Sequence, residues 1–107
     1  MRVYIAGPIT KGNQMDNIRA AIDVADEVLR AGHAPYCPHL TFFWHMIYPH
    51  QFEAWMALDK EWLGQCAAVI RLPGESEGAD REVAWARDLG RPVFSSVQTF
   101  LEWTRPL

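Results

Sequence analysis

The chain repeats a pattern in which a short apolar run is followed by a longer segment of helical period. The first run, Arg2–Ala6, ends at Gly7 and Pro8, as strands end at turns. The pattern predicts strands at residues 2–6, 33–37, 67–72 and 92–94. It predicts helices at residues 15–31, 49–64, 76–89 and 96–103.

This order of elements indicates an α/β fold. Alternation of strand and helix favours a parallel sheet with helices on both faces. In open sheets of this kind, ligands bind beyond the carboxyl ends of the strands. Three loops meet there in sequence terms, at residues 7–11, 38–39 and 73–78. Residues 39–51 are aromatic and irregular in period, so we expect a packed loop. Its aromatic side chains either cover an interface or core, which we favour, or stack on a base.

Length and composition indicate one globular domain, residues 1–107. Half of the residues are hydrophobic and the net charge is -3, which argues against binding to a nucleic-acid polymer. The two cysteines, Cys37 and Cys66, form no C-x-x-C pair, which favours a reducing compartment. No apolar run reaches the ~18 residues of a membrane span, and the start has no signal-peptide core. We therefore expect a cytoplasmic protein without membrane contact.

Two predicted helices each place one acidic residue among apolar neighbours. Glu82 falls inside the apolar stripe of the helix at 76–89, and Asp59 falls inside that of the helix at 49–64. The stripes consist of Ala79, Val83, Ala86 and Leu89 in one helix and of Phe52, Trp55, Met56, Trp62 and Leu63 in the other. Burying an unpaired carboxylate costs several kcal/mol or keeps the group protonated. A sequence that does this twice indicates a functional site.

Two interpretations of these acids stay open on this evidence. In the structural one, each acid pairs with a buried arginine or caps a neighbouring helix. In the functional one, the pair performs acid–base chemistry, or one acid attacks a sugar C1′ while the other holds a sugar hydroxyl or protonates the departing base. We favour function, because both acids occur near glycine-bearing turns.

The turn after the third predicted strand can hold an anion. Gly74 and Gly78 let backbone N–H groups approach a ligand, and Ser76 stands at the predicted N-cap. A capped helix with a flexible turn is the simpler interpretation of this segment. The negative charges of Glu75 and Glu77 also disfavour a phosphate at the tip of the turn. The run GPIT after the first strand is a second, weaker candidate.

No metal or cofactor is expected. Four residues could be considered as metal ligands, but their spacings match no standard zinc pattern. They are Cys37, His39, His45 and His50.

A family resemblance is carried by two stretches, MRVYIAGPIT and DKEWLGQCAAVIRLPGESEGADREVAWARDLGRPVF. Over residues 1–94 the chain resembles the nucleoside 2-deoxyribosyltransferase-like superfamily, and within it the short phage and bacterial members of unassigned function. It is also similar to the 2′-deoxynucleoside 5′-phosphate N-hydrolases. The spacing of Ser76, Gly78 and Glu82 after an apolar strand is the specific part of this resemblance.

The resemblance implies a flavodoxin-like or Rossmann-like three-layer sandwich with a parallel sheet of four to five strands, assembled as a homodimer or higher homo-oligomer. It implies that Glu82 is the nucleophile at C1′ and that Asp59 contacts the sugar or helps to protonate the base. Ser76 and Gly78 would bind a 5′-hydroxyl or 5′-phosphate. The other implied substrate-binding residues are Gly7, Pro8 and Ile9 of the first loop and His39 after the second strand.

The chain departs from these families in two ways. Its first loop offers Lys11 and Gly12 in place of the arginine–glycine pair of the N-hydrolases, and its carboxyl-terminal segment is shorter than that of the transferases. The expected ligand is a nucleoside or nucleotide, and the expected reaction is cleavage or transfer of its N-glycosidic bond. The alternative is a non-catalytic nucleotide-binding or sensor module of the same fold. A structural dimer with buried ion pairs is the third hypothesis.

Overall fold

A computed structural model describes residues 1–106 of the chain, so the last residue of the predicted domain, Leu107, lies outside the described residues. Four parallel strands form one sheet in the order β2-β1-β3-β4. The strands are β1 (Arg2–Ala6), β2 (Ala34–Tyr36), β3 (Ala68–Arg71) and β4 (Val93–Phe94). The helices are α1 (Gln14–Arg30), the 3-10 helix η1 (Pro38–Leu40), α2 (Thr41–Ile47), α3 (Phe52–Leu63), α4 (Glu77–Asp88) and α5 (Val97–Thr104).

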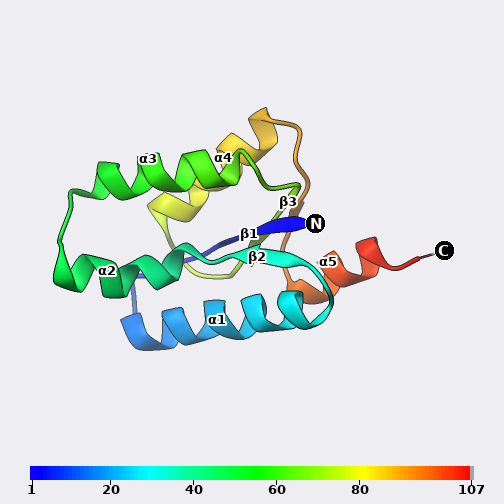
Figure 1. The fold of residues 1–107 in the computed structure, drawn as a ribbon, viewed down its shortest axis with the longest axis horizontal. Helices are drawn as coiled ribbons and strands as arrows, with labels where there is room; N and C mark the ends of the chain where they lie inside the picture. The colour runs from blue at the N-terminus through cyan, green and yellow to red at the C-terminus, as the bar shows by residue number, and fades with distance from the viewer. Residues whose placement is uncertain (107) are drawn as a thin grey trace.

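Helices cover both faces of the sheet, so the fold has three layers (Figure 1). Val3 and Ile5 of β1 point to the face covered by α1 and α5, and Tyr4 and Ala6 point to the face covered by α3 and α4. This alternation divides the core into two apolar clusters, one on each side of β1. The predicted fold class, a Rossmann-like α/β sandwich with a parallel sheet of four to five strands, is confirmed with four strands.

Every predicted strand and helix is present. The largest shift is at α3, which begins at Phe52 rather than at Pro49. The segment 39–51, predicted as a packed loop, instead contains part of η1 and the helix α2. No residue of α2 is buried, and a helix without a buried stripe leaves no apolar period in the sequence.

The apolar stripes of α3 and α4 are narrower than predicted. About half of the surface of Phe52, Trp62 and Leu89 is exposed. Phe52 is the first residue of α3 and Leu89 follows the last residue of α4, so both stand at helix ends. Trp62 instead stacks on Tyr36 of the edge strand β2, with ring centroids 5.6 Å apart. The buried stripes therefore depend on a few residues, and Asp59 and Glu82 are among them.

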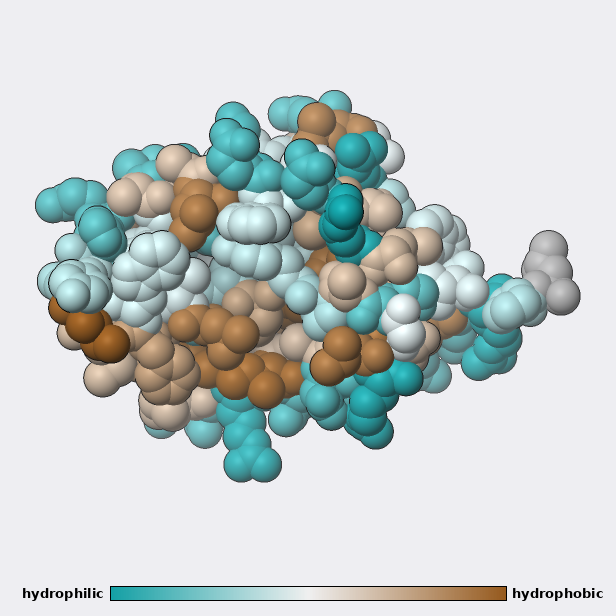
Figure 2. Space-filling model, in the orientation of Figure 1, coloured by the Kyte–Doolittle hydropathy of each residue, from teal (hydrophilic) through white to brown (hydrophobic). Residues whose placement is uncertain are grey.

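The helix α2 exposes large apolar side chains to solvent. Phe43, Trp44, Met46 and Ile47 are each at least half exposed. Figure 2 shows apolar atoms gathered at the outer end of α2 and along the line where α2 lies over α1. Among residues 1–106, no helix is long and apolar enough to cross a membrane.

The turn after β3 approaches the first loop closely at Gly74. This residue has a φ of +117°, and a Cβ there would lie 2.9 Å from Cγ of Pro8. Gly74→Ala is therefore expected to lower the free energy of unfolding by about 2 kcal/mol in urea denaturation. Gly90→Ala is the matched control, because Gly90 has a φ of +72° but a Cβ there meets nothing within 4 Å; its expected loss is about 1 kcal/mol. Equal losses would show that the contact with Pro8 does not constrain the turn.

Candidate active site

A cavity of about 490 Å³ lies beyond the carboxyl ends of the strands, where the loops after β1 and β3 meet α2 and α3. This is the edge at which open parallel sheets bind ligands. The structure brings seven of the eight predicted site residues to its wall. They are Gly7, Pro8, Ile9, Asp59, Ser76, Gly78 and Glu82.

Glu82 and Asp59 form a buried carboxyl pair at this wall. They come from α4 and α3, two helices that lie side by side on one face of the sheet (Figure 1). Only 4% of Glu82 and 6% of Asp59 is exposed, and the negative charge of each acid acts on the other. The two acids predicted from separate helices therefore belong to one site.

Two tyrosines contact this carboxyl pair from the sheet. The hydroxyl of Tyr4, on β1, donates a hydrogen bond to Oε2 of Glu82, and the hydroxyl of Tyr36, on β2, lies beside Asp59. Tyr4 and Tyr36 are partners in the parallel register of β1 and β2, so their side chains leave the same face of the sheet. Burial, followed by the nearby carboxylates, raises the pKa of both hydroxyls, so both stay protonated and act as donors.

Burial also controls the protonation of the carboxyl pair. It raises the pKa of Glu82 to about 8; the negative charge of Asp59 acts in the same direction, while the Tyr4 hydrogen bond and the charge of Arg71 oppose it. Burial raises the pKa of Asp59 to about 6, against hydrogen bonds from Glu82 and Tyr36. Because the two carboxyl groups interact, they titrate as a pair. At neutral pH the pair holds about one proton in total.

One oxygen of the pair lacks a partner. Oδ1 of Asp59 is buried and makes no hydrogen bond with any of residues 1–106. A buried acceptor without a partner costs about 1–3 kcal/mol. Asp59 also lines the cavity, so a ligand with a donor group would supply the partner that this oxygen lacks.

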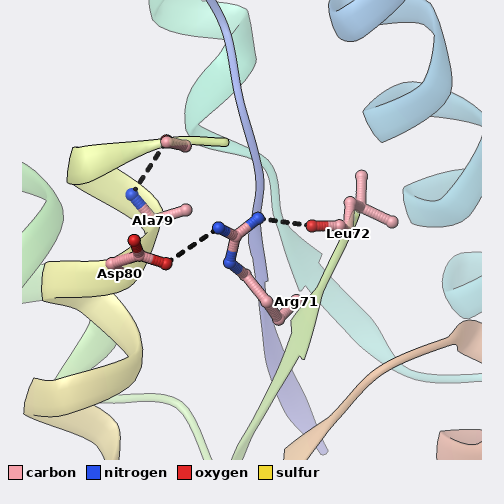
Figure 3. A network of polar contacts seen from close by, with 5 residues as sticks. Arg71, Leu72, Ala79 and Asp80 are labelled. Carbon is pink, nitrogen blue, oxygen red and sulfur yellow. Dashed lines mark hydrogen bonds and ion pairs between the residues drawn. The ribbon is translucent and has the colours of Figure 1, made fainter. Parts of the chain in front are cut away.

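The start of α4 is fixed by a small polar network (Figure 3). Oγ of Ser76 accepts a hydrogen bond from the N–H of Ala79 at 3.1 Å, which caps the helix. Arg71, at the end of β3, donates to the carbonyl of Leu72 and pairs with Asp80 through Nη2 at 2.9 Å. This network ties the first turn of α4 to β3, and it sets the position from which Glu82 extends one turn later.

Gly78 lets α4 approach α3 closely. A Cβ at Gly78 would lie 3.4 Å from Sδ of Met56 and 3.6 Å from the ring of Phe52. A Cβ at these distances makes ordinary van der Waals contact, so only a side chain larger than alanine would push apart the two helices that carry Asp59 and Glu82. Gly78 therefore contributes to the site by its small size as well as by the backbone N–H that it places at the helix start.

His39, the eighth predicted residue, does not line the cavity. It is fully buried under the first loop, where Nε2 donates to the carbonyl of Pro8 at 3.1 Å and Nδ1 lies 3.8 Å from Sγ of Cys37. Burial lowers the pKa of His39, so the ring is neutral and donates through a single nitrogen. In the structure it supports the loop from behind and makes no contact with the cavity.

The charged groups around the cavity are mostly acidic. Lys11 is the basic side chain at its mouth, and its Nζ lies 3.0 Å from Oε1 of Glu75. Glu77, Asp59 and Glu82 add further carboxyl groups. Among the described residues, no group of three or more His, Cys, Asp or Glu side chains is arranged to hold a metal ion.

Sequence reasoning missed Tyr4 and Tyr36 as members of the site. Each lies in a short apolar strand, where a tyrosine is ordinarily a core residue. Only the register between β1 and β2 brings the two rings together, 5.5 Å apart and below the carboxyl pair. The alternation of side chains along β1 does place Tyr4 and Ala6 on one face of the sheet. This alternation is the signal in the sequence that could have pointed to Tyr4 as a site residue.

Tyr4→Phe is expected to raise the pKa of Glu82 by about one unit, because the variant loses a hydrogen bond that favours the carboxylate. The titration of the Glu82 side-chain carboxyl carbon, followed by NMR, measures this shift. Tyr48→Phe is the matched control, because Tyr48 is exposed and lies outside the cavity wall. An unchanged Glu82 pKa in Tyr4→Phe would show that the hydroxyl does not tune the acid.

The fold is similar to that of two solved deoxyribosyltransferases. The chain has a nucleoside 2-deoxyribosyltransferase-like fold. It superposes on the 2-deoxyribosyltransferase of Bacillus psychrosaccharolyticus with a TM-score of 0.62 at 20% identity, over 87% of this chain and 69% of that enzyme. It superposes on the 2-desoxiribosyltransferase of Leishmania mexicana with a TM-score of 0.63 at 18% identity, over 86% of this chain and 61% of that enzyme.

Residues 1–96 match the family described as "Domain of unknown function (DUF7768)", and the chain belongs to this family. No curated protein matches the sequence. The predicted resemblance to the superfamily is thus confirmed at the level of the fold.

Proposed function

We propose that this protein cleaves or transfers the N-glycosidic bond of a nucleoside, with Glu82 as the nucleophile. The observation that carries the proposal is the buried carboxyl pair of Glu82 and Asp59 at the wall of a cavity of about 490 Å³. Similarity of the fold to two 2-deoxyribosyltransferases supports it. A carboxylate in this position suits attack on a sugar carbon whose transition state resembles an oxocarbenium ion.

The proposed reaction uses the single proton of the pair. Glu82 has the higher pKa of the two acids, so the reaction begins when this proton passes from Glu82 to Asp59 and leaves Glu82 ionised. A carboxylate oxygen of Glu82 then forms a bond to C1′ as the bond from C1′ to the base nitrogen breaks. The bonding electrons leave with the base, and Asp59 gives it the proton. Water or the N–H nitrogen of a second base then attacks C1′ as the bond from C1′ to Glu82 breaks. The proton of the attacking group passes to the Asp59 carboxylate, so the pair regains its single proton, and the outcome is hydrolysis or transfer.

The charges at the cavity favour a nucleoside over a nucleoside 5′-monophosphate. Lys11 is paired with Glu75, and Glu77 stands in the first turn of α4, where a phosphate would otherwise bind. A phosphate dianion placed there would meet carboxylates without a free cation at the cavity wall. A neutral 5′-hydroxyl can instead bond to the N–H of Gly78 or to Ser76.

The test is release of free base. The protein is incubated with a mixed pool of ribo- and deoxyribonucleosides and their 5′-monophosphates, with and without a second acceptor base, and the bases are separated by chromatography. Release from nucleosides, and exchange when an acceptor is present, are expected. Ligand-dependent stabilisation against melting without any base released would instead favour the non-catalytic binding module.

The expected homodimer or higher homo-oligomer is part of this proposal. The apolar face of α2, with Phe43, Trp44, Met46 and Ile47, offers a surface of the kind that such assemblies cover. Analytical ultracentrifugation measures the assembly state directly. A single domain over residues 1–107 and a cytoplasmic location remain predictions.

A further inference from the structure

One side of the cavity is a wall of aromatic rings that the carboxyl chemistry does not use. We call it the aromatic wall and define it by five residues that line the cavity: Phe42, His45, His50, Phe52 and Trp55. Phe42 and His45 come from α2, His50 from the connection to α3, and Phe52 and Trp55 from the first turn of α3. The segment predicted as a packed loop therefore supplies much of one side of the site.

Trp55 is the fixed centre of this wall. Its ring makes edge-to-face contacts with Trp44, His45 and His50, with centroids 5.1, 5.7 and 5.3 Å apart. Its indole N–H donates to Nδ1 of His45 at 2.8 Å. Contacts from three rings and a hydrogen bond hold the indole in one orientation, so the wall is formed before any ligand binds.

The hydrogen bonds of His45 determine its tautomer. Nδ1 accepts from two groups that can only donate, the indole N–H of Trp55 at 2.8 Å and the backbone N–H of His50 at 3.2 Å. A ring nitrogen that accepts carries no proton, so the proton of the neutral ring is on Nε2. Nε2 makes no hydrogen bond with any of residues 1–106, and it is not buried. His45 therefore brings a fixed, unused N–H donor to the aromatic wall, in which the other histidine is His50.

The aromatic wall lies next to the carboxyl pair. Trp55 and Asp59 are four residues apart on α3, which places them on the same face of the helix, one turn from each other. A flat heteroaromatic ring against Trp55 would thus have its attached sugar near Asp59 and Glu82. Stacking on an aromatic side chain contributes about 1–3 kcal/mol per base, and it accepts any base. Selection among bases requires a polar group at the ring edge.

We propose that the aromatic wall binds the base of the substrate and that His45 is its specificity-determining residue. Nε2–H of His45 donates to an acceptor at the edge of the base, either a ring nitrogen or a carbonyl oxygen. This inference rests on the proposed function for the identity of the ligand as a nucleoside. Beyond that function, the protein would discriminate between bases by one acceptor atom. The hydrogen bonds from Trp55 and His50 to Nδ1 make this possible, because they keep the proton of His45 on Nε2.

The experiment compares ligands that differ by one acceptor atom. Binding of purine and pyrimidine 2′-deoxynucleosides is measured by calorimetry against analogues in which a ring nitrogen is replaced by C–H or a carbonyl is removed. The Glu82→Gln chain is used so that no bond is cut, and the free bases are titrated into the wild-type chain as a second measurement. Loss of the acceptor atom that bonds to His45 is expected to weaken binding on the order of tenfold. Loss of any other acceptor atom is expected to have little effect.

Two variants of His45 separate recognition from support of the wall. In His45→Asn, the amide oxygen can replace Nδ1 as acceptor for Trp55, but the distant donor is lost. In His45→Gln, the amide N–H can replace Nε2–H, but the acceptor for Trp55 is lost. The tenfold loss of affinity for the analogue without the acceptor atom is expected to disappear in His45→Asn and to persist in His45→Gln. His45→Gln is also expected to melt at a lower temperature, because Trp55 loses its acceptor.

The outcomes distinguish this inference from the proposed function. If no nucleoside or base binds, or if the loss of affinity persists in His45→Asn, the role of His45 is wrong. If base is released by the wild-type chain but no single acceptor matters, the proposed function stands and the inference fails. If the loss of affinity follows His45 and no base is ever released, the inference stands and the proposed enzyme is a binding module.

Discussion

Glu82→Gln is expected to reduce base release from nucleosides by at least about 10³-fold while leaving the fold intact. The amide has the shape of the carboxyl group and can still accept the hydrogen bond from Tyr4, but its oxygen is a poor nucleophile. Removing a nucleophile in enzymes that form covalent intermediates has effects of this size or larger. The measurement is the single-turnover rate of base release by chromatography, together with the circular dichroism spectrum of the variant.

Glu61→Gln is the matched control for this substitution. Glu61 is on α3, is exposed and lies outside the cavity, so the same chemical change is made away from the site. Its rate is expected to equal that of the wild-type chain. Equal rates in Glu82→Gln and the wild-type chain would remove Glu82 from the mechanism.

Glu82→Ala gives a second way to identify the nucleophile. The smaller side chain leaves space at C1′, and added formate can supply the missing carboxylate. Partial recovery of base release in formate is expected for Glu82→Ala and not for the wild-type chain. Recovery would place the carboxylate on the sugar carbon, whereas a merely structural role of Glu82 predicts no response to formate.

The sequence predicted the carboxyl pair because its signal is local. In a helix, the position of a residue on the buried face follows from its spacing to neighbours within two turns, so Glu82 and Asp59 could each be placed without knowledge of the other helix. Their meeting at one wall followed from the topology of a parallel α/β sheet. The same argument placed Gly7, Ser76 and Gly78 at the cavity.

The parts that the sequence did not predict depend on contacts between distant segments. Tyr4 joins the site because α4 packs over β1 and brings Glu82 to its hydroxyl, and Tyr36 joins it through the register of β1 with β2. His39 follows β2 as predicted, but whether its ring faces the cavity or the back of the first loop depends on the packing of Pro8 above it. The role of His45 depends on Trp55, ten residues further along the chain.

The helix α2 shows why an aromatic segment can mislead. Its large side chains had no apolar period because no face of it is buried, and the segment was therefore expected to be a packed loop. In the structure, Phe42 and His45 face the cavity while Phe43, Trp44 and Met46 remain exposed. Aromatic residues here serve a ligand site and an open surface rather than a core.

The carboxyl pair is also expected to make the protein less stable as the pH rises from about 4.5 to about 8. Burial raises the pKa of Glu82 to about 8 in the folded chain, while an exposed glutamate in the unfolded chain titrates near 4.5. Between these values the folded chain holds a proton that the unfolded chain has released, so each rise in pH favours unfolding. The effect of Glu82 reaches its full size above pH 8 and amounts to several kcal/mol, because one pKa unit corresponds to about 1.4 kcal/mol.

The difference between the wild-type chain and Glu82→Gln isolates this effect from the other titrating groups. Burial lowers the pKa of His39, so that residue stabilises the fold as the pH rises towards the ordinary pKa of histidine and partly conceals the effect of Glu82 in the wild-type curve. His39 is unchanged in the variant and cancels in the difference. Urea denaturation at a series of pH values should give similar unfolding free energies for the two chains near pH 4.5 and a more stable variant at pH 8. A difference that stays constant with pH would mean that Glu82 is ionised in the folded chain throughout, and that burial does not raise its pKa.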